Sequence, residues 1–233
     1  MKVAVLQPGY LPWLGFFDQL RRADVFVYYD DVQYDTHGWR NRNRIKTQNG
    51  PIWLTVPVRH SGLDRPRILD VEIDGRSKWA KKHVASLRQA YAGAPFTRAY
   101  MPALEELLFR PWERLVDLDM AAAELMAEWF GLRRRIERAS LLGIDGGQSD
   151  RLLNICRHFG ASTYVSGAAA RDYLDVPLFE RHGIHVEWQQ FAHPVYPQPH
   201  GEFVPYLSAI DLLLNCGGEA AAVLQGRSAP VIE

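Results

Sequence analysis

Short apolar runs and a helical segment alternate at the start of the chain, and this order restricts the fold to a small set. An apolar run at 3–6 leads into a turn with two prolines and a glycine, a helix-like stretch at 16–22 and a second apolar run at 25–29. The order predicts a strand, a helix and a parallel strand, the first unit of an α/β sheet. Ligands bind such sheets outside the carboxyl ends of the strands. We therefore expect the turn at 7–13 and the pair Asp30–Asp31 at the ligand-binding edge.

The same alternation returns in the second half of the chain. Further strands of the sheet are expected near 136–140, 162–166 and 184–190, with helices between them. The intervening stretch differs, because a predicted hairpin of 40–46 and 52–58 is followed by amphipathic helices. We predict one α/β domain over 1–233, with an insert of hairpin and helices at 31–131.

Composition excludes several classes of protein. Lys plus Arg equals Asp plus Glu at 27 each, so the zero net charge disfavours nucleic acid as a partner. No apolar stretch approaches the roughly 20 residues of a membrane span, and the first apolar run is too short for a signal peptide. Two cysteines disfavour a disulfide framework. We expect a cytoplasmic protein without a membrane span, and the oligomeric state is left open.

One hydrophilic stretch alternates cations with amide or apolar side chains. If the stretch is extended, one face carries four cations: Arg40, Arg42, Arg44 and Lys46. The opposite face includes Asn43, which adds hydrogen-bonding capacity without charge. Arginine suits bidentate contact with phosphate or carboxylate, so the row favours an anion-binding site. The alternative is a solvated edge strand whose cations prevent aggregation.

A second candidate anion site follows the expected strand at 162–166. The strand ends in Ser166-Gly167, and the helical segment behind it contains Arg171. Backbone N–H groups at the start of a helix attract anions, and a guanidinium would add further donors. A tight strand-to-helix turn that serves packing alone explains the same residues equally well.

Few residues suit catalysis. Histidines show no helical metal-binding spacing, so we predict no metal site, and Cys216 falls at a helix C-terminus, where the dipole disfavours a thiolate. The chain has no GxGxxG, GxxxxGK[ST] or GxSxG motif. His193 remains as the best general base. One of Asp30 and Asp31 is expected to face the ligand, because adjacent strand residues point to opposite faces.

Seven blocks of sequence occur together in this chain: VLQPGYLPWLGFFD (5–18), DDVQ (30–33), NRNRIK (41–46), YVSG (164–167), RDYL (171–174), HPVYPQ (193–198) and LLLNCG (212–217). The combination resembles the WbqC-like family over nearly the whole chain. The resemblance implies a bacterial protein of the kind often encoded among surface-polysaccharide (O-antigen) or natural-product genes. It leaves the reaction open.

The stretch 12–16 is also similar to the P-H-x-G-H signature of nucleotidylyltransferases, with Trp13 and Phe16 in place of both histidines. This resemblance implies a HUP/nucleotidylyltransferase-like, Rossmann-like parallel sheet with helices on both faces. Ser166-Gly167 with Arg171 occupies the place of the second phosphate-binding motif. Transition-state stabilisation by two histidines would be absent, whereas binding of a nucleotide or a phosphopantetheine-linked donor stays open.

We predict from these features a transferase that moves an acyl or aminoacyl group to an amine of a sugar or small metabolite. The substrate would bear a phosphate held by the cation row, and the donor would be an activated acid or a carrier-protein thioester. Further substrate contacts are expected from four residues: Gln7, Tyr10, Trp13 and His200. The alternative is a non-catalytic protein that binds a nucleotide sugar on a degenerate nucleotidylyltransferase scaffold.

Overall fold

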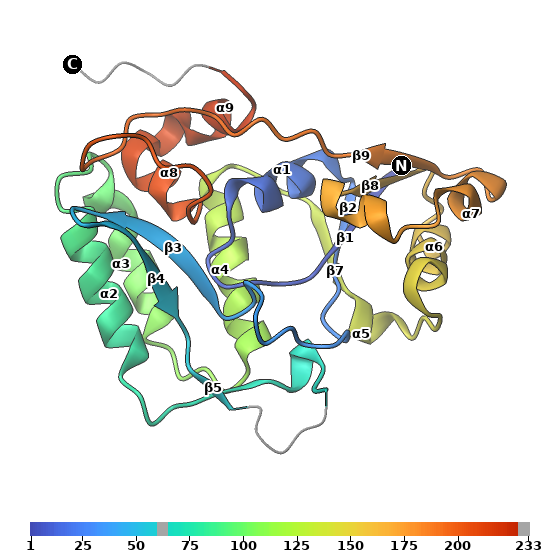
Figure 1. The fold of residues 1–233 in the computed structure, drawn as a ribbon, viewed down its shortest axis with the longest axis horizontal. Helices are drawn as coiled ribbons and strands as arrows, with labels where there is room; N and C mark the ends of the chain where they lie inside the picture. Colours follow the sequence, from blue (N-terminus) through green and yellow to red (C-terminus); the bar gives the residue numbers. More distant parts are fainter. Residues whose placement is uncertain (60–64, 228–233) are drawn as a thin grey trace. The chain divides into compact units, whose positions relative to one another are not determined.

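The computed structural model describes residues 1–59 and 65–227, which form two compact units (Figure 1). Unit 1 comprises Met1–Gln7, Gly15–Val32 and Arg133–Phe191. Unit 2 comprises Pro8–Leu14, Gln33–Leu132 and Ala192–Glu233. The predicted insert at 31–131 thus corresponds to the central segment of unit 2, which two further segments join. The single domain over 1–233 stays a prediction.

Unit 1 is built on a five-stranded parallel sheet with the order β7-β2-β1-β8-β9. Its strands are β1 (Lys2–Leu6), β2 (Val25–Tyr28), β7 (Arg135–Arg138), β8 (Thr163–Ser166) and β9 (His185–Trp188). The chain therefore starts at the centre, adds strands on one side and then crosses to the other. This arrangement is Rossmann-like, and its topological switch point lies between β1 and β8.

Helices cover both faces of this sheet because its strands alternate their side chains. The helices of unit 1 are α1 (Leu14–Arg22), α5 (Ala139–Leu142), α6 (Gln148–His158), η2 (Ala168–Asp172) and α7 (Val176–Arg181). Val27 joins a core cluster with Cys156 of α6 and Phe179 of α7. Phe26 contacts Phe16 of α1, with ring centroids 5.2 Å apart. The predicted parallel sheet with helices on both faces is confirmed.

One strand of the sheet ends earlier than its sequence suggests. The expected strand at 136–140 stops at Arg138, and Ala139 begins helix α5. Ser140 donates its backbone N–H to the carboxylate of Asp30, 3.0 Å away. The N–H group of Ser140 is therefore bonded to a residue that is distant in sequence. The periodicity of the local sequence cannot reveal such a partner.

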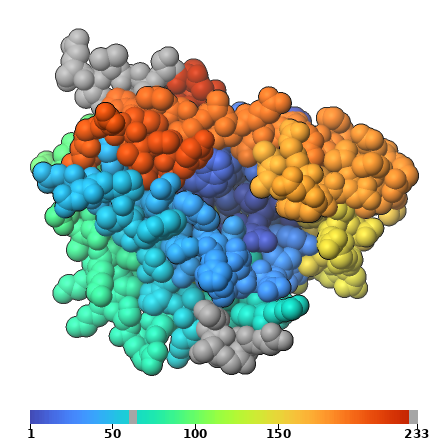
Figure 2. Space-filling model, in the orientation of Figure 1, coloured from blue at the N-terminus to red at the C-terminus, as the bar shows by residue number. Residues whose placement is uncertain are grey.

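Unit 2 combines an antiparallel hairpin with helices, and the predicted hairpin is confirmed. The elements of unit 2 are β3 (Arg42–Thr47), β4 (Gly50–Thr55), β5 (Val58–Arg59), η1 (Ile68–Asp70), β6 (Glu72–Ile73), α2 (Trp79–Ala90), α3 (Thr97–Leu108), α4 (Leu115–Trp129), α8 (Ile210–Cys216), η3 (Gly217–Glu219) and α9 (Ala220–Leu224). In the hairpin, Arg44 lies opposite Trp53 and Ile45 lies opposite Ile52. The hairpin side chains form part of the surface seen in light blue in Figure 2.

The core of unit 2 lies where the helices pack on one another and on the hairpin. Helix α2 packs against α3 and β3, and α3 packs against α4 and α8. Their apolar faces bury large side chains such as Leu87, Leu104, Leu118 and Leu213. Helix α4 buries a carboxylate, Asp119, on this face. Across the described part of the chain, no helix has the length and apolar character needed to cross a membrane.

Candidate functional site

The proline-rich loop that follows β1 belongs to unit 2 and is fixed by the residues around the start of β3. The carbonyl oxygen of Arg40 accepts the N–H of Tyr10 at 2.9 Å. The guanidinium of Arg40 donates to the carbonyl oxygen of Pro8, also at 2.9 Å. Asn43 donates from Nδ2 to the carbonyl oxygen of Leu11 at 2.7 Å. The predicted substrate residues Tyr10, Arg40 and Asn43 are thus brought together, and Asn43 serves to hold the loop.

Tyr10 is buried and forms a hydrogen bond with His83 of α2. The phenolic oxygen lies 2.9 Å from Nδ1 of His83. Burial lowers the pKa of His83 to about 4, so the imidazole is neutral near pH 7 and Nδ1 accepts the phenolic proton. His83 also forms a hydrogen bond to the backbone of Thr55. These contacts give Tyr10 a fixed position in unit 2.

The half-buried side chains of Arg42 and Arg44 lie beside the exposed indoles of Trp39 and Trp53, and together they are here called the arginine–tryptophan surface. The guanidinium carbon of Arg42 lies 4.8 Å from the Trp53 ring centroid, and that of Arg44 lies 5.5 Å from Trp39. The two indoles, 4.8 Å apart, are 43% and 44% exposed. In the residues that the structure describes, neither arginine forms an ion pair with a carboxylate. Both guanidinium groups therefore keep an unneutralised charge beside exposed aromatic rings.

Lys46, the last cation of the predicted row, lies in a different environment. Its side chain is only 2% exposed, and Nζ donates to the carbonyl oxygens of Gly201 and Glu202 at 3.2 and 2.5 Å. The buried carboxylate of Asp211 lies in the same network and accepts the Tyr91 hydroxyl at 2.7 Å. The charge of Lys46 is thus enclosed within unit 2. Its predicted contact with substrate stays a prediction.

Asp119 on α4 is a polar residue that sequence reasoning missed. Its side chain is fully buried, and within the described residues neither carboxylate oxygen has a hydrogen-bond partner. Burial raises its pKa well above the usual range, and the nearby Arg40 guanidinium opposes this shift. Asp119 also acts electrostatically on Tyr10 and Tyr34. The available signal was a single carboxylate at an apolar position of the helical repeat.

Both predicted histidines have backbone partners in unit 2. Nδ1 of His193 lies 2.8 Å from the carbonyl oxygen of Pro194, and Nε2 accepts the N–H of Tyr206 at 3.1 Å. Burial lowers the pKa of His193 below its ordinary value. Nε2 of His200 lies 2.7 Å from the carbonyl oxygen of Ala90. A catalytic role for His193 would require release of the amide that Nε2 now accepts, so it stays a prediction.

The two residues at the signature-histidine positions pack with other side chains. Trp13 lies beside Tyr206, with ring centroids 5.8 Å apart, and forms a β-bridge with Ser208. Phe16 is buried in unit 1 against Phe26. Neither side chain carries an imidazole, so the adenylyl-transfer chemistry of the two histidines has no counterpart here. The contact of Trp13 with substrate stays a prediction.

In unit 1, the switch point brings together three of the predicted residues. Gln7 follows β1, Ser166 is the last residue of the neighbouring strand β8, and Gly167 comes directly after it. Arg171 lies in η2, a 3₁₀ helix in the place of the expected helical segment, and its guanidinium carbon lies 4.8 Å from the ring centroid of Trp188. This edge of the sheet is the place where Rossmann-like folds bind ligands. Contacts of these residues with substrate stay predictions.

Asp30 and Asp31 have separate partners in unit 1, as their expected opposite orientation implies. Asp30 is fully buried and accepts hydrogen bonds from Nε of Arg138 at 2.8 Å and from Oγ of Ser140 at 2.7 Å. Asp31 forms a bidentate pair with Arg151 at 2.9 and 2.5 Å. Each carboxylate already has protein donors, and their catalytic roles stay predictions.

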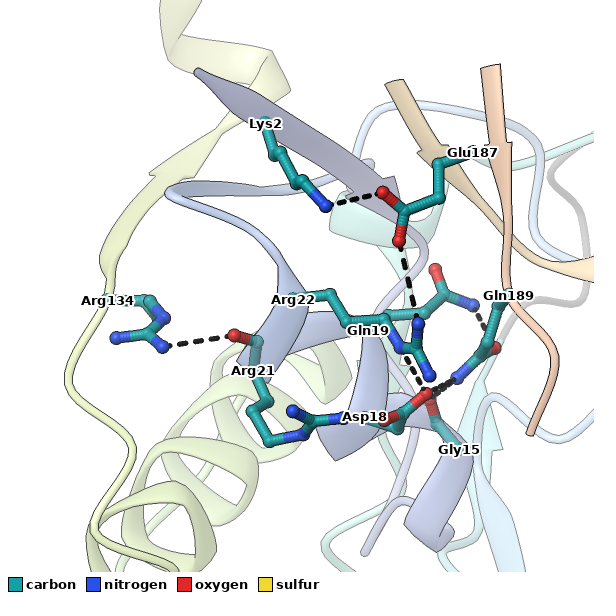
Figure 3. A network of polar contacts seen from close by, with 9 residues as sticks. All are labelled: Lys2, Gly15, Asp18, Gln19, Arg21, Arg22, Arg134, Glu187 and Gln189. Carbon is teal, nitrogen blue, oxygen red and sulfur yellow. Dashed lines mark hydrogen bonds and ion pairs between the residues drawn. The ribbon is translucent and has the colours of Figure 1, made fainter. Parts of the chain in front are cut away.

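A further polar network joins α1 to β9 in unit 1 (Figure 3). Asp18 accepts hydrogen bonds from Arg22 at 2.8 Å and from Nε2 of Gln189 at 2.8 Å. Gln19 donates to the side-chain oxygen of Gln189 at 2.9 Å. A Cβ atom at Gly167 would lie 3.1 Å from Nε2 of Gln19, so a glycine allows this close approach. Sequence reasoning did not identify the network, whose members come from distant segments.

The fold and these polar clusters define an α/β protein with a Rossmann-like sheet and a second unit of hairpin and helices. A model of the WbqC-like protein family matches residues 7–223, and the chain belongs to this family, which confirms the resemblance found in the sequence. A Mycobacterium tuberculosis protein, "Uncharacterized protein Rv1507c", is 36% identical over 228 residues, which cover 96% of this chain and 97% of the relative. No solved structure matches the chain.

Proposed function

We propose that this protein is a cytoplasmic transferase of surface-polysaccharide (O-antigen) or natural-product biosynthesis. It binds a phosphate-bearing sugar or small metabolite and transfers an acyl or aminoacyl group to an amine of that substrate. Membership of the WbqC-like family supports the biosynthetic setting. The observation that carries the proposal is the arginine–tryptophan surface, where Arg42 and Arg44 have no carboxylate partner within the described residues.

The geometry of this surface suits a phosphate with an attached ring. Arg42 and Arg44 are two residues apart on β3, so their side chains leave the same side of the strand. Arg42 donates from Nη2 to the carbonyl oxygen of His37 at 2.7 Å and from Nε to that of Gly38 at 3.2 Å, so backbone groups already engage part of a guanidinium that has five N–H donors. The remaining donors can form charge-assisted bonds to phosphate oxygens. The exposed indoles of Trp39 and Trp53 offer apolar faces to a sugar ring or a base.

In this proposal His193 is the general base and acts through Nε2. Its bond from Nδ1 to the carbonyl oxygen of Pro194 sets the tautomer that leaves Nε2 as the acceptor nitrogen. Tyr206 must release its N–H from that nitrogen before a substrate proton can be taken. A carrier-protein thioester or another activated acid is the acyl donor.

The binding step is tested with an Arg42→Ala/Arg44→Ala double variant. Isothermal titration with a nucleotide-linked amino sugar should give at least a tenfold loss of affinity, because two charge-assisted contacts are removed. The Arg42→Lys/Arg44→Lys variant should recover only part of the affinity, since lysine lacks the planar fork. Arg110→Ala in unit 2, which removes an exposed arginine paired with Glu106, is the matched control. If the double variant binds with unaltered affinity, the two arginines do not bind the ligand and belong to a solvated edge strand.

The transfer step is tested by incubating the protein with amino-sugar nucleotides and a panel of acyl donors. Mass spectrometry should detect an acylated product, and His193→Ala should abolish turnover with binding nearly intact. Binding without turnover over a wide donor panel would instead favour the second candidate, a non-catalytic nucleotide-sugar binding protein. The observation that favours this candidate is the replacement of both signature histidines by Trp13 and Phe16.

A further inference from the structure

Tyr206 links two parts of unit 2, the arginine–tryptophan surface and His193. Its backbone N–H is donated to Nε2 of His193 at 3.1 Å. Its carbonyl oxygen accepts a hydrogen bond from Nη2 of Arg44 at 3.4 Å. The backbone of one residue therefore contacts the proposed general base through its N–H and a proposed phosphate-binding arginine through its carbonyl group.

The backbone of Tyr206 is held in a strained conformation. Its φ angle is 59°, in the left-handed region that a large side chain rarely adopts. The ring is 51% exposed and lies beside the rings of Trp13 and His193, with centroids 5.8 and 5.1 Å away. A strained conformation persists only where the surrounding contacts hold it, and such residues are concentrated at functional sites. Loss of one of these contacts therefore favours a change of backbone conformation at Tyr206.

The chain is fixed on both sides of Tyr206, so such a change is confined to a short segment. The side-chain amide of Gln198 donates to the carbonyl oxygen of Val204 at 3.1 Å, and the N–H of Val204 donates to Oε1 of Gln198 at 2.9 Å. Beyond Tyr206, the N–H of Ser208 donates to the carbonyl oxygen of Arg44 at 2.9 Å. Only three residues lie between Val204 and Ser208. Tyr206 can thus change its conformation while the rest of this segment keeps its position.

We propose that phosphate bound at Arg44 releases Tyr206 from His193 and thereby makes Nε2 available to the substrate. The bond from Arg44 to the carbonyl oxygen of Tyr206 is long and its acceptor is uncharged, whereas phosphate oxygens accept shorter, charge-assisted bonds. Nε of Arg44 is a further donor that has no partner among the described residues.

The release follows from the contacts that hold Tyr206. When the guanidinium of Arg44 turns to phosphate, the carbonyl group of Tyr206 loses its donor, the backbone leaves the left-handed region and the N–H leaves Nε2 of His193. Tyr206 is then a positioning residue that keeps the base engaged until a phosphate-bearing substrate is bound. This inference deepens the proposed function, on which it rests for the roles of Arg44 and His193.

The first measurement needs no ligand. Arg44→Ala removes the donor to the carbonyl oxygen of Tyr206, and the loss of a typical hydrogen bond should make hydrogen exchange of the Tyr206 amide, followed by NMR, about tenfold faster. The matched control is Arg42→Ala, which removes the same charge from the same strand but from a side chain that donates to His37 and Gly38. Exchange in this control should keep the wild-type rate. Unchanged exchange in Arg44→Ala, or equal acceleration in both variants, would overturn the proposal.

The second measurement adds inorganic phosphate to the wild type. Exchange of the Tyr206 amide should become faster, and the Nε2 resonance of His193 should shift because this nitrogen no longer accepts an N–H. Arg44→Ala should show neither response. If phosphate shifts the Nε–H resonance of Arg44 but leaves exchange of Tyr206 unchanged, the release is overturned and the phosphate contact of the proposed function stands. If phosphate does not bind, that contact is overturned and the proposed release with it. Release without product in the transfer assay would contradict the proposed reaction alone.

Discussion

The phenolic oxygen of Tyr10 and Nδ1 of His83 are 2.9 Å apart, and both side chains are buried in unit 2. The bond ties the proline-rich loop to helix α2. Burial raises the pKa of Tyr10, so the phenol keeps its proton and donates it to the neutral imidazole, which also forms a hydrogen bond with the backbone of Thr55. The position of the loop therefore depends on a contact between two residues that are distant in sequence.

Removal of this hydrogen bond should destabilise the protein. Tyr10→Phe leaves Nδ1 of His83 buried without a donor, so the free energy of unfolding should fall by about 1–3 kcal/mol. Urea unfolding followed by circular dichroism measures the change. Tyr100→Phe is the control, because the Tyr100 ring packs on Trp129 and is only partly buried. Equal effects of the two variants would argue against a specific role for the Tyr10 hydroxyl.

Acidification should lower the free energy of unfolding through protonation of His83. Its folded-state pKa of about 4 lies below the ordinary value of 6.5, so on acidification the unfolded chain binds the proton first. The stability contributed by the neutral imidazole is present above pH 6.5 and is lost as pH falls through 4, with a slope of up to about 1.4 kcal/mol per pH unit. Urea unfolding between pH 7 and pH 5 measures this slope.

The comparison protein for this pH series is the His83→Gln variant, which cannot titrate at that position. Asp119 contributes with the opposite sign, because burial raises its pKa and its contribution is lost as pH rises. The difference in slope between the wild type and His83→Gln isolates the imidazole. Identical slopes would show that His83 is not buried in its neutral form.

Asp30 should be important for the stability of unit 1. Asp30→Asn removes the buried partner of Arg138 and weakens the bonds that start helix α5, so we expect a loss of about 3 kcal/mol. Glu137→Gln, on the same strand as Arg138, removes a more exposed ion pair and should cost less than about 1 kcal/mol. Unfolding curves of the two variants decide between these values. If Asp30→Asn leaves the free energy of unfolding unchanged, the hydrogen bonds to Arg138 and Ser140 contribute little to stability.

Neither cysteine should react while the protein is folded. Burial raises the pKa of Cys156 to about 12 and that of Cys216 to about 11, so both thiols are protonated near pH 7. Iodoacetamide, followed by mass spectrometry, should label neither residue in buffer and both in urea. Rapid labelling of Cys216 in the folded protein would reopen the possibility of a thiol nucleophile.

The sequence alone identified the sheet, the hairpin and most of the helices, because the alternation of apolar side chains is a local property of each segment. It also placed Ser166 and Gly167 at the end of a strand beside the one that precedes Gln7, since the order of elements restricts the topology. Local pattern failed where a distant partner intervened. The expected strand at 136–140 stops at Arg138 and helix α5 begins at Ala139, and the N–H of the next residue, Ser140, is bonded to Asp30.

Only the tertiary structure decided which polar residues have partners. Four cations looked equivalent in the sequence, yet Lys46 is enclosed by backbone carbonyl groups while Arg42 and Arg44 remain beside exposed indoles. Asp119 looked like one carboxylate in a helix, and its lack of a donor among the described residues appears only when α4 is packed. Hydrogen bonding and burial depend on groups brought together from distant segments, and the local sequence does not encode those distances.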